Sequence, residues 1–165
     1  FGGTNDFWKT KIGARKYFMV WKKKKMSFSQ RGQVALGQGY SSNSLPLYER
    51  YYAGGIHTLR GYEYHEVGPT VDGEPIGGES RLLLSSELRY PILKQMNLTG
   101  VFFLDAGNVY NKVSDFDPFS LEAAVGPGIR FFSPVGPMGF EYGFKIQPEP
   151  GQSSGEFHFR MGTGF

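Results

Sequence analysis

The stretch LPLYERYYAGGIHTLRGYEY, from Leu45 to Tyr64, is the longest part of the chain that does not read as a β-strand. It contains a glycine pair and a Leu-Arg-Gly-Tyr sequence, and a polar, glycine-rich run follows it as far as Ser80. The segments on both sides alternate apolar and polar residues, as half-buried strands do. A connection this long within a compact domain is usually functional or disordered. We therefore predict an ordered internal loop between β-strands.

The composition favours a single all-β domain. The chain has 165 residues, with 24 Gly, 15 Phe, 10 Tyr and no Cys. Glycine relieves crowding on the inner face of a β-barrel, and aromatic residues line the membrane interfaces. No run approaches the roughly 18 apolar residues of a membrane-spanning helix, whereas a barrel strand needs only about ten alternating residues. The lack of Cys excludes a disulfide framework and thiol catalysis.

Alternation predicts about eight strands, each with one apolar or aromatic face and one face of glycine, serine and charged residues. The expected strands are 7–21, 26–40, 81–92, 98–110, 121–132, 138–145 and 156–165, and the first part of the loop stretch, 45–53, is a further candidate that could lead outward as a strand. A soluble barrel buries its apolar face, whereas a transmembrane barrel turns that face towards lipid, and alternation alone does not distinguish the two. The pattern of short turns and long loops, and the charges of both signs on the polar face, favour an antiparallel up-and-down transmembrane β-barrel.

Arg60 is the candidate functional residue of the loop. Glu87 and Asp105 lie on the polar parity of the two strands that follow the loop, and those strands should be antiparallel neighbours. An arginine on a loop that folds into a barrel is costly unless it is paired. Two carboxylates can hold its five donors in a fixed geometry. We therefore predict a structural latch, not a catalytic site.

The basic run Lys22–Lys25 could indicate binding to nucleic acid or to anionic lipid, but a solvated hairpin tip is the favoured interpretation. Lys16 falls on the apolar face of its strand, where its charge would cost roughly 2–4 kcal/mol near the middle of a bilayer. Either its side chain reaches an interface or a β-bulge shifts the register.

Metal binding and hydrolysis are weaker hypotheses. The spacing of the three histidines, His57, His65 and His158, fits no standard metal site. A hydrolase triad could be assembled from Ser85 or Ser86, His158 and Asp105, but no G-x-S-x-G sequence supports it.

The motifs together resemble one family. The run LPLYERYYAGGIHTLRGY is similar to the loop-six region of the BamA family of outer-membrane β-barrel assembly factors, in which a V/I/L-R-G-F/Y motif ends a loop that tucks into the barrel. Four further segments resemble the last strands of that family, in order: SSELRYPI (85–92), FFLDAGNVY (102–110), GIRFFSPVGPMGFEYGF (128–144) and FHFRMGTGF (157–165). The resemblance covers roughly residues 28–165.

The resemblance implies roles for individual residues. Arg60 corresponds to the motif arginine, and Glu87 and Asp105 correspond to its carboxylate partners. The loop-six motif comprises Gly54, Gly55, Leu59, Arg60, Gly61 and Tyr62. The C-terminal β-signal and the seam between first and last strands comprise Phe157, Phe159, Gly162, Gly164 and Phe165.

The family architecture is a series of periplasmic POTRA domains followed by a sixteen-stranded barrel. By that comparison, residues 1–165 form a single barrel domain without POTRA domains and without the first half of the strands. Eight strands with both termini on the periplasmic side could close as a small barrel. Its interior would only just accommodate side chains, so the loop would be displaced and Arg60 released from its partners.

The resemblance implies a non-enzymatic insertase of the bacterial outer membrane, without metal or cofactor. Its expected partners are outer-membrane lipid and, in the full-length protein, client β-barrel proteins and assembly-complex lipoproteins; neither nucleic acid nor a small-molecule substrate is expected. The alternatives are a two-partner secretion or TamA-like transporter barrel of the same superfamily and, in another class, a soluble or hydrolytic small β-barrel.

Overall fold

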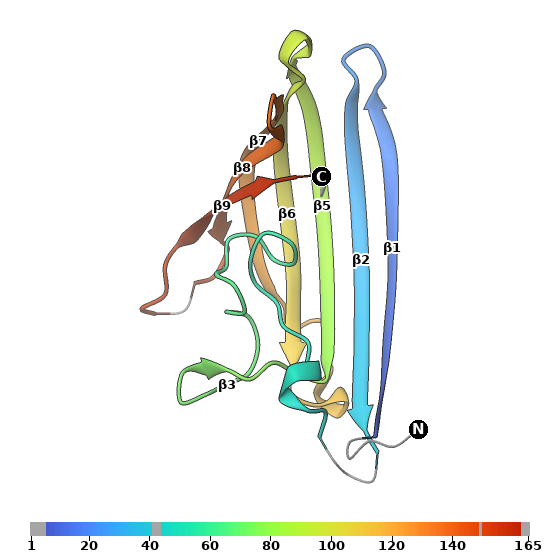
Figure 1. Cartoon of the computed structure of the whole chain (residues 1–165), viewed down its shortest axis with the longest axis vertical. Helices are drawn as coiled ribbons and strands as arrows, with labels where there is room; N and C mark the ends of the chain where they lie inside the picture. The colour runs from blue at the N-terminus through green and yellow to red at the C-terminus, as the bar shows by residue number, and fades with distance from the viewer. Residues whose placement is uncertain (1–5, 41–43, 149, 163–165) are drawn as a thin grey trace.

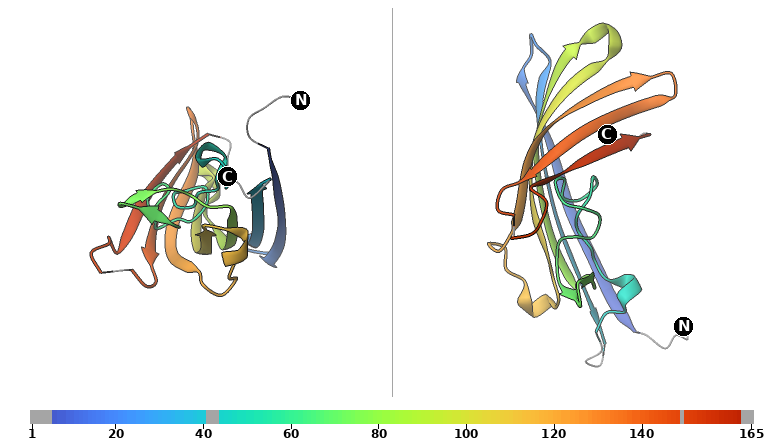
Figure 2. Two further views of the ribbon diagram at one scale, coloured as in Figure 1. Left: turned by 90° about the horizontal axis from the view of Figure 1, so that it is seen from below. Right: turned by 90° about the vertical axis from the view of Figure 1, so that its left-hand side faces the viewer.

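The computed structural model describes residues 6–40, 44–148 and 150–162. Seven long strands form one antiparallel sheet in the order β1-β2-β5-β6-β7-β8-β9. The sheet is curved and open, with β1 and β9 as its two edges (Figures 1 and 2). The sheet strands are β1 (Phe7–Trp21), β2 (Met26–Gly39), β5 (Ser80–Leu93), β6 (Leu98–Tyr110), β7 (Glu122–Ser133), β8 (Gly136–Lys145) and β9 (Gly155–Met161).

The remaining elements are short. They are the 3-10 turns η1 (Leu47–Glu49), η2 (Lys94–Met96) and η3 (Val113–Asp115), and the two-residue strands β3 (Thr70–Val71) and β4 (Glu74–Pro75), which pair with each other. None of the helical segments in the described ranges is long and apolar enough to cross a membrane.

The strand expected over residues 45–53 is absent, and that prediction was wrong. The segment contains η1 and joins other parts of the loop only through isolated bridges, such as Tyr51 with Gly78. The reason is that β2 pairs directly with β5, from Ser27 opposite Arg89 to Leu36 opposite Ser80. No sheet edge is therefore available to a strand between them.

The strand count changes the position of the chain ends. With seven antiparallel strands, the start of β1 and the end of β9 lie towards opposite ends of the sheet, and not on one side as expected for eight strands (Figure 1). The two edge strands do not pair with each other, so the small closed barrel predicted as one possibility is not formed.

The two faces of the sheet differ in the way that the alternation predicted. The face that carries Glu87 and Asp105, which we call the inner face, is covered by the long loop. The opposite, outer face exposes large apolar side chains, among them Ile12, Phe18, Val20, Leu84, Ile92, Phe102, Leu104, Ile129, Phe157 and Phe159.

The buried core lies between the loop and the inner face. It consists of Ala53, Leu59, Tyr62 and Val67 from the loop, packed on Leu83, Val109 and Ala124 from the strands. Charged residues are buried on the same face: Glu87, Asp105, Arg130, Glu141, Lys145 and His158. A water-soluble protein does the reverse, because it hides large apolar side chains and solvates charges. The distribution fits a sheet whose outer face meets lipid.

Candidate functional site

The loop tip is a compact turn that places Arg60 against the inner face. The Gly55 amide donates to the carbonyl of Tyr62 at 2.9 Å, and the Thr58 hydroxyl donates to the carbonyl of Gly54 at 2.6 Å. Gly54 and Gly55 have φ of 111° and 87°, and an added Cβ at Gly54 would lie 2.1 Å from the carbonyl oxygen of Glu63. The turn therefore requires the glycine pair.

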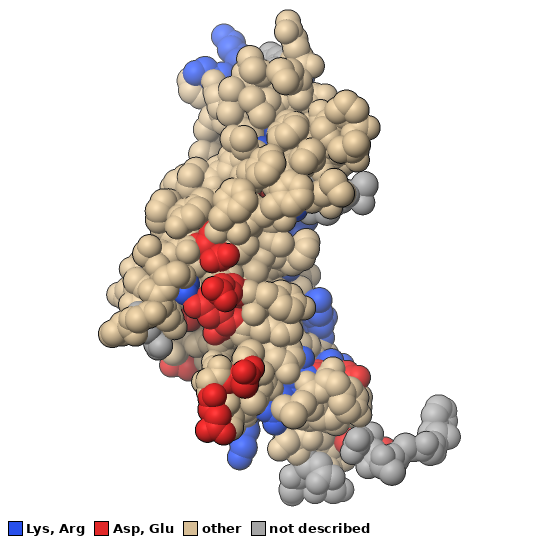
Figure 3. Space-filling view, turned by 60° about the vertical axis from the view of Figure 1, so that its left-hand side comes forward, with Lys and Arg blue, Asp and Glu red and all other residues tan. Residues whose placement is uncertain are grey.

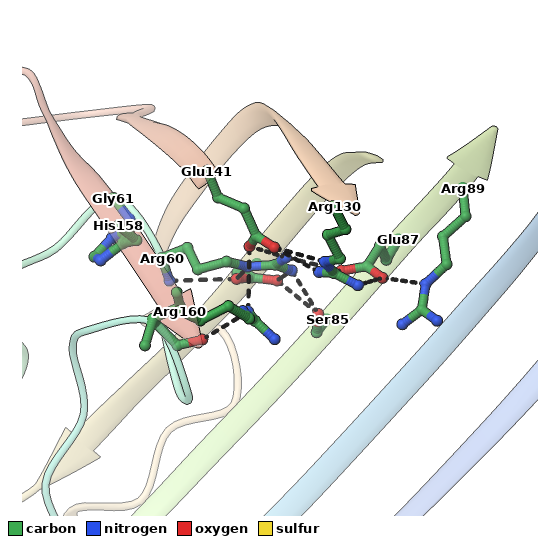
Figure 4. Close-up of polar contacts among 11 residues, drawn as sticks. Arg60, Gly61, Ser85, Glu87, Arg89, Arg130, Glu141, His158 and Arg160 are labelled. Atoms are coloured by element: carbon green, nitrogen blue, oxygen red, sulfur yellow. Dashed lines mark hydrogen bonds and ion pairs between the residues drawn. The ribbon is translucent and has the colours of Figure 1, made fainter. Parts of the chain in front are cut away.

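Arg60 is 4% exposed and contacts three buried carboxylates (Figure 4). Its Nε and Nη2 donate to the two oxygens of Asp105 at 2.6 and 2.8 Å, which is a bidentate pair. Its Nη1 donates to Glu87 at 2.8 Å and to Glu141 at 2.9 Å. The guanidinium also lies 3.7 Å from the centroid of the Phe103 ring. We call Arg60 and these three carboxylates the latch.

The structure thus brings Arg60 together with both residues predicted to hold it, and adds Glu141 from β8. The release of Arg60 that was expected for a closed small barrel does not arise, because that barrel is not formed. The physical reason is that the sheet stays open, so the loop is not excluded by a narrow interior. Ser85 supports the arrangement, because its hydroxyl donates to Asp105 at 2.6 Å.

Arginines from three strands complete the charge balance of the latch. Arg130 donates from Nη1 and Nη2 to the two oxygens of Glu87 at 2.9 and 2.7 Å, and its Nε reaches Glu141 at 2.8 Å. Arg89 pairs with Glu87 at 2.6 Å, and Arg160 pairs with Glu141 at 3.3 Å. Each of the two glutamates therefore joins more than one cation, so that no buried carboxylate of the network is left uncompensated.

Gly61 is held against β8 and β9. An added Cβ at Gly61, which has a φ of 93°, would lie 2.7 Å from the Cβ of Ala124, and one at Gly143 would lie 2.5 Å from Cα of Gly61. The loop and β8 can approach this closely only because both positions lack a side chain. The Gly61 amide donates to Nε2 of His158 at 2.9 Å.

Tyr62 closes the other side of the loop tip. It is 2% exposed, and its hydroxyl donates to Glu122 at 2.8 Å, while the ammonium of Lys145 lies 4.7 Å from its ring centroid and pairs with Glu66. Burial, together with the hydrogen bond to Glu122, raises the pKa of Tyr62 above its ordinary value. The phenol therefore stays neutral at physiological pH and acts as a donor.

Burial by itself would lower the pKa of Arg60. The hydrogen bond and charge of Asp105, and then the charge of Glu141, outweigh burial and raise that pKa above its ordinary value. Arg60 therefore keeps its positive charge at physiological pH.

The remaining predicted residues lie elsewhere. Leu59 is fully buried in the core. Phe157 and Phe159 project from the outer face of β9, with ring centroids 6.2 and 5.2 Å from that of Phe140. Gly162 follows the strand with a φ of 106°, whereas Gly164 and Phe165 lie outside the described residues.

The hydrolase hypothesis finds no geometry among the described residues. His158 accepts from the Gly61 amide and contacts no serine hydroxyl, while Ser85 already donates to Asp105. Sequence reasoning missed the roles of Glu141, Arg130, His158 and Gly143. The available signal was alternation, which places all four on the same parity as the inner-face glycines of β7 to β9.

Comparison with known proteins agrees with this architecture. The whole chain, residues 1–165, matches the Omp85 superfamily domain. The chain belongs to the Omp85 superfamily.

Several relatives of this Omp85 chain are assembly factors by name. The outer membrane protein assembly factor BamA of Nitratidesulfovibrio vulgaris is 31% identical over 99% of this chain and 21% of its own length. BamA of Neisseria meningitidis is 29% identical over 81% of this chain and 21% of its own length. The chloroplastic outer envelope protein 80 of Arabidopsis thaliana is 30% identical over 78% of this chain. The chain thus spans about a fifth of the length of these BamA relatives.

A solved structure shows the same fold. The crystal structure of BamA from Haemophilus ducreyi lacking POTRA domains 1–3 matches with a TM-score of 0.82 at 23% identity, over 94% of this chain and 34% of that chain. At this identity the comparison bears on the fold, which is the Omp85 barrel wall.

Because Arg60 pairs with three buried carboxylates, we expect its removal to lower the free energy of unfolding substantially. Replacing Arg60 with Ala leaves three buried carboxylates with fewer partners, so folding should lose about 3–5 kcal/mol. In the full-length protein, the temperature at which heat-modifiable gel migration is lost should fall markedly. Arg15→Ala is the matched control, because Arg15 lines a cavity together with Arg60, while among the described residues its guanidinium bonds only to the Tyr17 hydroxyl. Equal behaviour of the two variants would contradict the latch.

The close approach of loop and sheet predicts a steric effect. Gly143→Ala should push the loop tip away from β8, so that trypsin cleaves after Arg60 roughly tenfold faster or more, as the open population rises. Gly32→Ala is the control, since its nearest contact would be Leu84 at an ordinary 3.5 Å. Cleavage of Gly143→Ala at the wild-type rate would show that the loop is not seated at this contact.

Proposed function

We propose that this chain is the C-terminal barrel portion of an outer-membrane protein insertase, which assembles β-barrel proteins into the bacterial outer membrane. The observation that carries the proposal is the seated loop, with Arg60 bound to Glu87, Asp105 and Glu141, in a chain whose named relatives are BamA assembly factors. The chain lies in the bacterial outer membrane, as its BamA relatives indicate, and its exposed apolar outer face fits contact with lipid.

The role proposed for the latch is mechanical. Arg60 joins carboxylates of β5, β6 and β8. On β9, His158 accepts from the Gly61 amide, and Arg160 donates to the Ile56 carbonyl. The loop thereby braces the strands from β5 to β9 from within. Bending and opening are then confined to the sheet edges, where β9 has no strand on its far side within the described chain.

The proposed site of action is the β9 edge. An edge strand presents unpaired backbone groups on which another chain can add a strand. A client barrel strand that pairs there would exchange hydrogen bonds with the insertase until it pairs with its own neighbours. Such exchange needs no covalent chemistry, so we propose a non-enzymatic role without cofactor. Client β-barrel proteins, assembly-complex lipoproteins and outer-membrane lipid are the proposed partners; neither nucleic acid nor a small-molecule substrate is proposed.

The function is tested with the full-length protein in liposomes. A urea-denatured client barrel, diluted into these liposomes, should fold several-fold faster than in liposomes that hold an unrelated outer-membrane barrel at equal density. The measurement is the heat-modifiable folded fraction against time. Equal rates in the two preparations would contradict an insertase and favour the two-partner secretion or TamA-like alternative.

A further inference from the structure

The lysine turn, Lys22–Lys25, has no role in the latch or the sheet edge. It joins β1 to β2, and all four residues are exposed. The Lys25 amide donates to the carbonyl of Lys22 at 3.2 Å, which closes the turn. Within the described ranges, no carboxylate forms an ion pair with these ammonium groups. Four like charges in consecutive positions repel one another, so the turn is complementary to an anionic partner.

The position of the turn identifies the environment of these charges. It lies at the same end of the sheet as η2 and the turn between β7 and β8 (Figure 1). Outer-membrane barrels carry their short turns on the periplasmic side. Large apolar side chains are exposed towards this end: Trp21, Tyr90, Ile92, Leu93, Met96, Phe132 and Val135. The lysines therefore project just beyond the apolar belt, at the level of lipid headgroups.

The surface view agrees with this placement. In Figure 3, basic atoms lie at the short-turn end, above a broad area that shows almost no charged side chain, and the acidic groups gather in the opposite half. A periplasm-facing anion at this end would meet positive charge and little negative charge.

Two lysines in this region each place their ammonium group near an aromatic ring. The ammonium of Lys24 lies 4.5 Å from the centroid of the Trp21 ring. On the outer face, the ammonium of Lys16 lies 5.1 Å from the centroid of Phe18, which is two residues nearer to the turn. Lys16 thus extends along an apolar surface towards the headgroup level, as lysines beside lipid do.

We propose that the lysine turn, with Trp21, is a binding site for anionic phospholipid headgroups of the periplasmic leaflet. The lipid phosphate would pair with the ammonium groups of Lys22–Lys25, and the acyl chains would lie along Phe18, Val20 and Phe28 on the outer face. Phe18 and Phe28 form one surface, with ring centroids 6.3 Å apart. A lipid fits both parts of the site, whereas a nucleic acid or a free phosphate uses only the charges. The inference rests on the outer-membrane placement stated above.

The test measures lipid retention by the full-length protein in detergent, by native mass spectrometry. Phosphatidylglycerol should be retained by the wild type, and phosphatidylcholine much less. Replacing all four lysines with Gln should weaken phosphatidylglycerol retention at least roughly fivefold, because even one lysine near an anionic surface contributes about 1 kcal/mol. The matched variant with four Arg keeps the charge and should retain the lipid.

The outcomes separate this inference from the proposed function. Equal phosphatidylglycerol retention by the wild type and the Gln variant would overturn the lipid site, as would equal retention of the two lipids by the wild type. Displacement of the lipid by millimolar inorganic phosphate would also overturn it, since it would reduce the site to an anion contact. The assay contains no client protein, so its result is independent of insertase activity. Heat-modifiable migration of each variant verifies that the barrel is folded.

Discussion

Three buried carboxylates from three strands depend on the loop arginine at their centre. Glu87, Asp105 and Glu141 are each at most 6% exposed, and a carboxylate in such a position is stable only with charged partners. Arg60 reaches all three because a guanidinium offers several donors in one plane. Arg60 lies on the loop and the three carboxylates lie on the sheet. The charges of the inner face are therefore balanced only when the loop is seated on it.

The close packing around Arg60 follows from this pairing. For the guanidinium to reach the carboxylates, the loop backbone beside Arg60 must lie against the sheet. Gly61 and Gly143 are so close there that a side chain on Gly143 would clash with the Gly61 backbone. The outer face can be apolar because the charged groups of the latch are paired on the inner face. The alternation of each strand thus places apolar side chains on the lipid-facing side and the paired charges on the inner side.

The sequence predicted the seven strands of the sheet and three of the four members of the latch, Arg60, Glu87 and Asp105, and the physical reasons are local. A period of two sustained over about ten or more residues indicates a long strand, and Glu87 and Asp105 lie on sequential strands that pair with each other. Glu141 was not assigned to Arg60 because β8 reaches the latch only through the curvature of the sheet, and curvature is a property of many strands together. The strand over 45–53 was wrongly predicted for another reason that lies outside the local sequence. Leu45, Tyr51 and Ala53 are buried against other parts of the fold, and such burial gives an alternating pattern without a strand.

Hydrogen exchange of the full-length protein in a lipid bilayer tests the seated loop most directly. The amides of Gly55, Leu59, Arg60 and Gly61 are bonded within the loop or to the inner face. The account predicts that these four amides exchange about as slowly as those of β5 and β6, and far more slowly than the amide of His57, which is exposed beside them. Exchange of the four amides as fast as that of His57 would contradict it.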